Sequence, residues 1–160
     1  MPSYEERLER FIEKAGPLCH AECPPDDRRT VLDELLALAA ADDWPASCRT
    51  PEGGYVPHCL HDDPAGWSLT MIVLAHGGAT PIHDHPSWGA AATVSGVERN
   101  LRYKDPGRHV LVDEQVAPPG GGYLFGRRDI HKAVDGTGDV TVSVHLLVDS
   151  GPHDVEVLPS

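Results

Sequence analysis

Residues 79–89 read ATPIHDHPSWG, and they place two histidines on either side of one aspartate. Side chains two positions apart in an extended strand point to the same face of a sheet. His83 and His85 are therefore expected to converge, while Asp84 points away. Two interpretations of the pair are open at this point: ligands of one metal ion, or hydrogen-bonded polar side chains on one side of a strand.

Glycines flank this pair at a regular spacing, G-x5-H-x-H-x3-G-x6-G, which runs from Gly77 through Gly89 to Gly96. A third histidine, His131, follows a glycine turn in GRRDIHKAVD, at the head of an expected strand. These spacings are compatible with a small barrel whose mouth gathers three imidazoles. Neutral imidazoles suit a borderline divalent ion and leave coordination positions open, and iron, zinc or nickel would fit such a site.

The rest of the chain supports many short strands after two helices. Leucine spacing predicts helices over residues 4–14 and 27–41. The segments that read as strands, separated by turn residues, are 67–75, 89–95, 98–103, 109–116, 122–126, 131–134 and 139–148. Fifteen prolines and sixteen glycines also favour short elements over long helices.

Composition limits the kind of protein. A chain of 160 residues fits one domain, and a net charge of −12 repels phosphate backbones and anionic membrane surfaces, so no nucleic-acid or membrane partner is expected. The charged first residues contain no apolar signal core, which predicts a cytoplasmic protein. The four cysteines, Cys19, Cys23, Cys48 and Cys59, are expected to be reduced structural thiols, with a metal knuckle in CHAEC as the alternative.

The glycine and histidine spacing matches the first cupin motif, with Gly89 where many cupins carry a metal-binding glutamate. His131 stands where the second cupin motif carries its histidine. The fold class expected is therefore all-β: a cupin, a small β-barrel of the jelly-roll type. We expect a single cupin domain over residues 1–160, with a helical part at 1–45 packed outside and the cupin core at 55–150.

Three stretches, TPIHDHPSWG, GRRDIHKAV and VSVHLLV, resemble the bacterial thiol dioxygenases of the cysteine dioxygenase and 3-mercaptopropionate dioxygenase family. The likeness extends from about residue 55 to 147. It implies a mononuclear Fe²⁺ held by His83, His85 and His131, a thiol substrate, and transfer of both atoms of O2 to sulfur to give a sulfinate. It also implies a relay in which Ser143 orients His145 from the same strand.

Several positions depart from that family. The tyrosine of the relay falls on Leu147, the tryptophan before the first motif falls on Leu74, and the cysteine that mammalian members crosslink falls on Gly89. The arginine that grips the substrate carboxylate in cysteine dioxygenases falls on Pro57, and no arginine follows Arg128. The iron ligands are thus complete, whereas the contacts to the substrate differ.

Four residues are candidates for the substrate pocket: Tyr55, Trp88, Arg102 and Leu147. Trp88 fits either the pocket or the core. A carboxylate has four candidate partners, each of which also suits a solvated surface: Arg99, Arg102, Arg127 and Arg128.

The leading hypothesis is an iron-dependent thiol dioxygenase with an altered substrate, acting as a monomer or small homo-oligomer. Two alternatives stay open. One is a repurposed iron cupin oxygenase that acts on carbon or nitrogen in specialised metabolism, and the other is a metal-binding or ligand-binding cupin without turnover.

Overall fold

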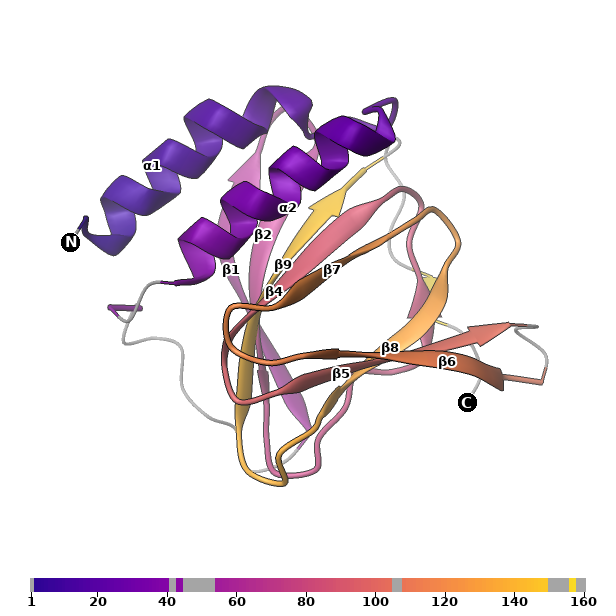
Figure 1. Cartoon of the computed structure of the whole chain (residues 1–160). Coiled ribbons are helices and arrows are strands. Elements are labelled where there is room, and N and C mark those ends of the chain that lie inside the picture. Colours follow the sequence, from indigo (N-terminus) through magenta and orange to yellow (C-terminus); the bar gives the residue numbers. More distant parts are fainter. Residues whose placement is uncertain (1, 41–42, 45–53, 105–107, 150–155, 158–160) are drawn as a thin grey trace.

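The computed structural model describes residues 2–40, 43–44, 54–104, 108–149 and 156–157 (Figure 1). Two helices are followed by strands that pair antiparallel throughout the described ladders. The helical elements are α1 (Tyr4–Ala15), the 3-10 turn η1 (Gly16–Leu18) and α2 (Pro25–Ala39). The strands are β1 (Tyr55–Asp63), β2 (Trp67–Leu74), β3 (His83–Asp84), β4 (Gly89–Ser95), β5 (Glu98–Lys104), β6 (Val110–Ala117), β7 (Gly122–Phe125), β8 (Ile130–Asp135), β9 (Thr141–Val148) and β10 (Glu156–Val157).

The strands form two sheets of five, in the orders β1-β2-β9-β4-β7 and β10-β3-β8-β5-β6. Side-chain hydrogen bonds from β5 to β7 and β9 show that the two sheets face each other. The predicted all-β architecture is therefore present as two facing sheets. No ladder joins the two sheets within the described ranges, so the closed barrel of the prediction is not shown.

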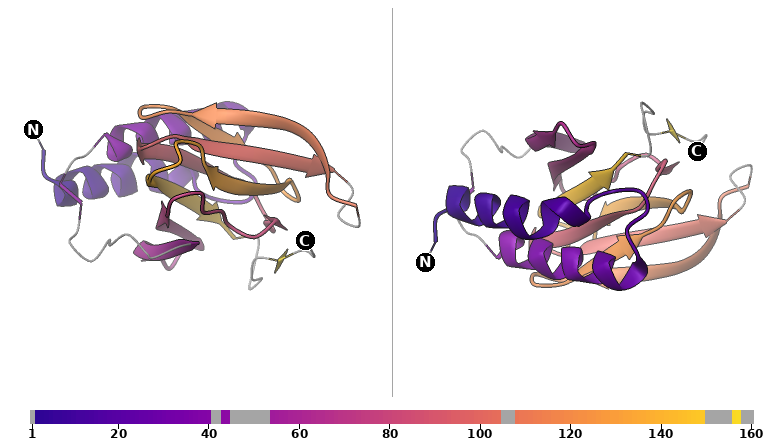
Figure 2. Two further views of the ribbon diagram at one scale, coloured as in Figure 1. Left: turned by 90° about the horizontal axis from the view of Figure 1, so that it is seen from below. Right: turned by 90° about the horizontal axis from the view of Figure 1, so that it is seen from above.

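Both helices lie on the outer face of the first sheet, as predicted, and Figures 1 and 2 show them side by side across its strands. α2 contacts β4, β7 and β9, and α1 packs mainly on α2. A capping box between Ser3 and Glu6 starts α1. α2 starts two residues before the predicted boundary because Pro25 has the backbone angle that suits a first helical turn. None of the described helices is long and apolar enough to cross a membrane.

The main apolar core lies between these helices and the first sheet. Alternate residues of the central strands supply it, among them Leu69 and Met71 of β2 and Val144 and Leu146 of β9, together with Phe11 and Leu35 of the helices. The residues between them in sequence face the second sheet instead. In β9 these are Ser143 and His145, both buried. The space between the two sheets therefore holds polar side chains beside aliphatic ones such as Ile72 and Ala133, and the candidate site lies there.

Two glycines of the first motif make the turns that position this site. Gly77 has φ +69°, and its N–H donates to Asp135 Oδ2 at 3.1 Å. Gly96 has φ +77°, and a Cβ there would lie 2.6 Å from Thr141 Oγ1. Both positions require glycine, since an L side chain disfavours this backbone region and the second site has no room.

Three strands escaped the sequence prediction. β1 contains Pro57, which has no backbone N–H for a ladder, and it ends in the polar run His61, Asp62 and Asp63, which resembles a loop. β3 and β10 are two residues each, too short for any periodicity. The predicted strands all form, with ends within two residues of the expected boundaries.

Candidate metal centre

The three motif histidines come together between the sheets. His83 lies in β3 directly opposite His131 of β8, and His85 follows immediately after β3. One potential ligand atom from each of the three lies within 4.8 Å of the others, and His85 Nε2 is 3.2 Å from His131 Nε2. This is the arrangement that the spacing predicted, and the group could hold a metal ion.

Two of these imidazoles are oriented through their second ring nitrogen. His83 Nδ1 lies 2.7 Å from the carbonyl oxygen of Pro81, and His131 Nδ1 lies 2.8 Å from Asn100 Oδ1. Both partners are acceptors, so Nδ1 carries the proton in each ring and Nε2 presents its lone pair. The Asn100 amide is itself oriented, because its Nδ2 donates to Gln115 Oε1 at 2.8 Å. Metal-binding histidines are generally held by such partners.

The 3.2 Å between His85 Nε2 and His131 Nε2 fits two ligands of one ion. Nitrogens about 2.1 Å from a shared ion lie roughly 3.0 to 3.4 Å apart for angles between octahedral and tetrahedral. The protonation state also fits. Burial, followed by the neighbouring His83 and His145, lowers the pKa of His85 to about 3, and burial lowers the pKa of His83 and His131 as well. Neutral imidazole is the form that binds metal.

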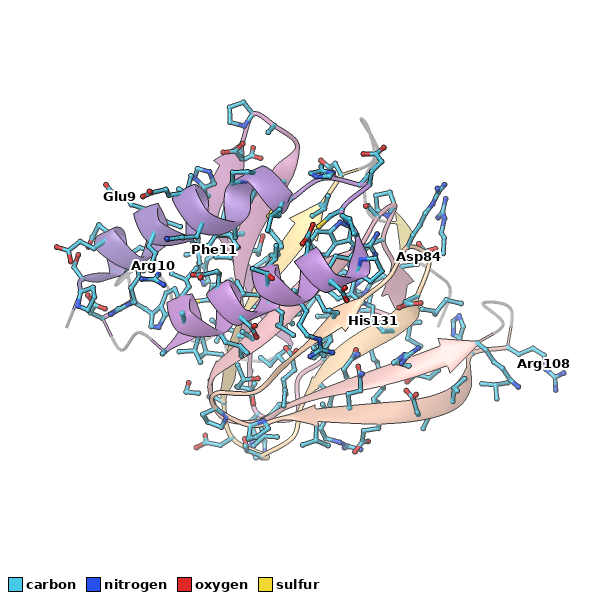
Figure 3. The ribbon with its side chains drawn as sticks, turned by 45° about the horizontal axis from the view of Figure 1, so that its top comes forward. Glu9, Arg10, Phe11, Asp84, Arg108 and His131 are labelled. Atoms are coloured by element: carbon cyan, nitrogen blue, oxygen red, sulfur yellow. The ribbon has the colours of Figure 1, made fainter. Side chains whose placement is uncertain are left out.

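Asp84 turns away from the cluster, as the alternation predicted, and it serves the loop before β8. Arg128 Nη1 donates to Asp84 Oδ2 at 3.1 Å, and the Arg128 backbone N–H donates to the carbonyl oxygen of His85 at 3.1 Å. Asp84 and His131 are labelled in Figure 3. These two contacts tie the loop 126–129 to the histidine segment, so Arg128 is committed to the framework of the site.

Phe125 occupies the space that a side chain at the glutamate position of the first motif would need. A Cβ built on Gly89 would lie 2.6 Å from Phe125 Cε2, and closer still to its Cζ and to the carbonyl oxygen of Leu146. The Phe125 ring packs against the rings of His85 and His131, with centroids 4.7 and 5.0 Å apart. The site is therefore built for three histidines, and an aromatic ring closes the side on which a glutamate would enter.

A cavity of about 310 Å³ opens onto the three histidines. Two predicted pocket residues, Tyr55 and Leu147, line it, and so does His145. Among the described residues that line the cavity, none is arginine or lysine. The remaining lining residues are small, aliphatic or hydroxylated: Pro57, Thr70, Ile72, Thr80, Pro81 and Ala133.

The structure corrects the placement of the other two predicted pocket residues. Trp88 belongs to the core beneath the helices, where its Nε1 donates to the carbonyl oxygen of His20 at 2.8 Å. It precedes Gly89, which faces Phe125, so strand alternation sends the indole to the opposite face of the sheet. Arg102 is outside the cavity lining and pairs with Asp113 at 3.5 Å across β5 and β6. Arg99 likewise pairs with Glu114, on the partly exposed surface.

The predicted contact between Ser143 and His145 is present, with Ser143 Oγ 3.0 Å from His145 Nε2. The sequence did not reveal the carboxylate that both residues meet. Glu98 of β5 has no exposed surface, and its Oε1 lies 2.6 Å from Ser143 Oγ and 3.1 Å from His145 Nε2. Tyr123 of β7 donates to the other oxygen, Oε2, at 2.7 Å. A polar cluster of four side chains from three strands thus stands beside the cavity.

The alternative metal knuckle in CHAEC finds no support. Of the described residues, the group of three that could hold a metal ion is His83, His85 and His131. Cys19 and Cys23 are buried free thiols, and burial raises the pKa of Cys19 to about 12. A protonated thiol is a poor metal ligand. Cys59 is also free, and Cys48 lies outside the described residues.

Solved structures identify the fold. A cupin superfamily protein from Desulfitobacterium hafniense aligns over 71% of this chain and 86% of its own, with a TM-score of 0.52 at 10% identity. A cupin-like protein from Thermotoga maritima aligns over 68% and 78%, with a TM-score of 0.57 at 14% identity. An oxalate oxidase in complex with the substrate analogue glycolate aligns over 64% of this chain and 55% of its own, with a TM-score of 0.53 at 17% identity.

No family model matches the sequence. At these identities the likeness concerns the fold alone. The chain has the cupin fold, the double-stranded β-helix, and it carries a three-histidine group suited to a metal ion at the position where its two motifs meet.

Proposed function

We propose that this chain is a mononuclear iron oxygenase that adds both atoms of O2 to the sulfur of a small thiol. The observation that carries the proposal is the meeting, in one cavity, of three neutral imidazoles and His145 from the opposite sheet. His83, His85 and His131 would hold Fe²⁺. When bound, ferrous iron supplies the one-electron chemistry that O2 needs in order to react.

The reaction converts a thiol and O2 into a sulfinate and one proton. Sulfur loses four electrons and O2 gains four, so no further reductant is needed. The chain must bind the thiol with its sulfur toward the three histidines and must accept one proton. His145 is the cavity-lining residue suited to accept it, because the three triad nitrogens would be occupied by the metal.

The cavity favours a thiol without a charged group. Its aliphatic lining includes Ile72 and Leu147, and no cation stands among the described lining residues. A buried carboxylate needs a paired cation, so a substrate such as 3-mercaptopropionate would leave its charge unpaired here. We therefore propose that the substrate is an uncharged or larger thiol and is neither free cysteine nor 3-mercaptopropionate.

The test is O2 consumption by the iron-loaded protein with 2-mercaptoethanol, longer uncharged alkyl thiols, L-cysteine and 3-mercaptopropionate. The expected result is one sulfinate formed per O2 consumed, with kcat/KM for an uncharged thiol at least tenfold above both acids. A kcat/KM of about 10⁴ M⁻¹s⁻¹ or more with either acid would overturn the substrate class. If the protein binds iron but consumes no O2 with any of these thiols, the proposed reaction is wrong. Oxidation of carbon or nitrogen, or ligand binding alone, would then be favoured.

A further inference from the structure

Glu98 is a fully buried carboxylate that the metal site does not use. It begins β5, two residues after the turn at Gly96, and it accepts hydrogen bonds from Ser143 and Tyr123 on two other strands. Burial acts to raise its pKa, but the nearby His145 and the three hydrogen bonds bring the pKa below the ordinary value of a glutamate. A carboxylate held in this way is ionised, and an ionised carboxylate can only accept hydrogen bonds.

This carboxylate determines which nitrogen of His145 carries the proton. The Ser143 hydroxyl donates its hydrogen bond to Glu98 Oε1 at 2.6 Å, so the Ser143 oxygen acts as an acceptor toward His145. His145 Nε2 therefore faces two acceptors, Glu98 Oε1 at 3.1 Å and Ser143 Oγ at 3.0 Å. An acceptor pair requires an N–H, which places a proton on Nε2, and in the neutral ring Nδ1 is then the nitrogen that keeps its lone pair.

His145 also lines the cavity. The hydrogen bonds that it makes in the described structure all involve Nε2. Its position is set by its neighbours in the sheet: Ala91 of β4 pairs with His145 on one side and with Tyr123 on the other. The small alanine side chain, itself fully buried, stands between the two larger residues that Glu98 joins.

We propose that Glu98 is a positioning residue that fixes His145 with its proton on Nε2, so that Nδ1 accepts a proton from the substrate in the cavity. The proposal rests on the thiol chemistry proposed above. The S–H bond of the substrate breaks, its proton moves to Nδ1, and the electron pair stays on sulfur as a thiolate. The imidazolium that forms is stabilised by the Glu98 charge, and Tyr123 holds the second carboxylate oxygen in place.

A spectroscopic test needs no turnover. In the full chain labelled with ¹⁵N-histidine and loaded with Zn²⁺, His145 should be neutral with its proton on Nε2, and that proton should resonate downfield and exchange slowly. Glu98→Gln should move this proton upfield, because a neutral amide replaces the charged acceptor. Glu114→Gln, the same change at the surface pair with Arg99, should leave it in place. An Nδ1 proton in the wild type, or an unchanged spectrum in Glu98→Gln, would overturn the proposal.

A kinetic test separates positioning from simple packing. An alkyl thiol of high pKa needs a proton acceptor, whereas an electron-poor thiol is already ionised at pH 7. Glu98→Gln should lower kcat/KM about 100-fold for the alkyl thiol and less than tenfold for the acidic one. An equal loss for both thiols would overturn the positioning role. If the wild type oxidised no thiol, the thiol chemistry above would fail, and the spectra would still decide whether Glu98 fixes His145.

Discussion

Asn100→Leu is the substitution that probes the metal centre without removing a ligand. Asn100 is 1% exposed, and its Oδ1 accepts the hydrogen bond that the His131 ring makes away from the cluster, at 2.8 Å. Leucine has the same branched shape and number of heavy atoms, and it offers no acceptor. His131 is also buried, so water has little access to replace the lost partner.

Loss of such an orienting partner weakens metal binding about 10-fold to 100-fold, which corresponds to roughly 1.4 to 2.7 kcal/mol. Because the buried His131 Nδ1–H would be left without an acceptor, we expect the upper part of this range. The assay is anaerobic competition between the protein and a chromophoric chelator for Fe²⁺ or Co²⁺. Asn100→Asp, which keeps an acceptor oxygen at this position, is the control and should bind at least as tightly as the wild type.

The reasoning would be refuted by a folded Asn100→Leu protein whose metal affinity stays within threefold of the wild type. Circular dichroism and a thermal melt establish folding independently, since this change also removes the partner of Gln115. A parallel fall in Asn100→Asp would show that the amide acts through packing and not through His131.

Three further predictions address the surroundings of this centre. Gly89→Ala should lower the free energy of unfolding in urea by about 1 to 3 kcal/mol, because the new methyl group meets Phe125 and a backbone carbonyl. The control Gly126→Ala, where a Cβ makes only ordinary contacts, should change it little, and equal losses in the two variants would contradict this. His145→Ala should keep one metal ion per chain and lose about 100-fold or more in kcat/KM, and loss of the metal would instead make His145 a ligand. The pKa of His85 falls from 6.5 to about 3 on folding, so between these pH values the unfolded chain binds a proton that the folded chain does not. The metal-free protein should therefore lose up to about 1.4 kcal/mol of stability per pH unit as the pH falls from 6.5 toward 3. His85→Ala should flatten that slope between about pH 6.5 and 4.5, and an unchanged slope would contradict the lowered pKa of His85.

Local periodicity was enough to predict the residues that share one strand or one motif. His83 and His85 converge because they are two apart, and the same rule brings Ser143 beside His145. The histidine of the second motif, His131, followed from its place after a glycine turn. The convergence of His83 and His85 needs only the geometry of an extended chain. The cupin motif singled out His131, and the resemblance to the thiol dioxygenases singled out Ser143 and His145.

The residues that the sequence did not reveal depend on how distant strands pair. In ERNLRY, Glu98 and Asn100 alternate with Arg99 and Leu101, a pattern that equally suits a solvent-facing strand. Only the pairing of β5 with β8, and the packing of that sheet against β9, turn these polar groups inward. Their position just after Gly96, the last residue of the first motif, is the signal that could have pointed to them.

Phe125 is an apolar residue whose role also could not be predicted from the sequence. The alternation in GYLF places Tyr123 and Phe125 on one face of β7, but their partners are set by the register with β4. That register puts Phe125 opposite Gly89, where it fills the glutamate position, and Tyr123 opposite Ala91, near Glu98. Sequence spacing alone contains no information about this cross-strand register.

The measurement that tests the central claim most directly is the metal content of the wild-type chain and of His131→Ala after loading with Fe²⁺ without oxygen and removal of unbound ion. The claim is that His83, His85 and His131 bind one ion jointly. It predicts one iron per wild-type chain and none in His131→Ala, with both proteins folded. One iron per chain in folded His131→Ala, or none in the wild type, would contradict it.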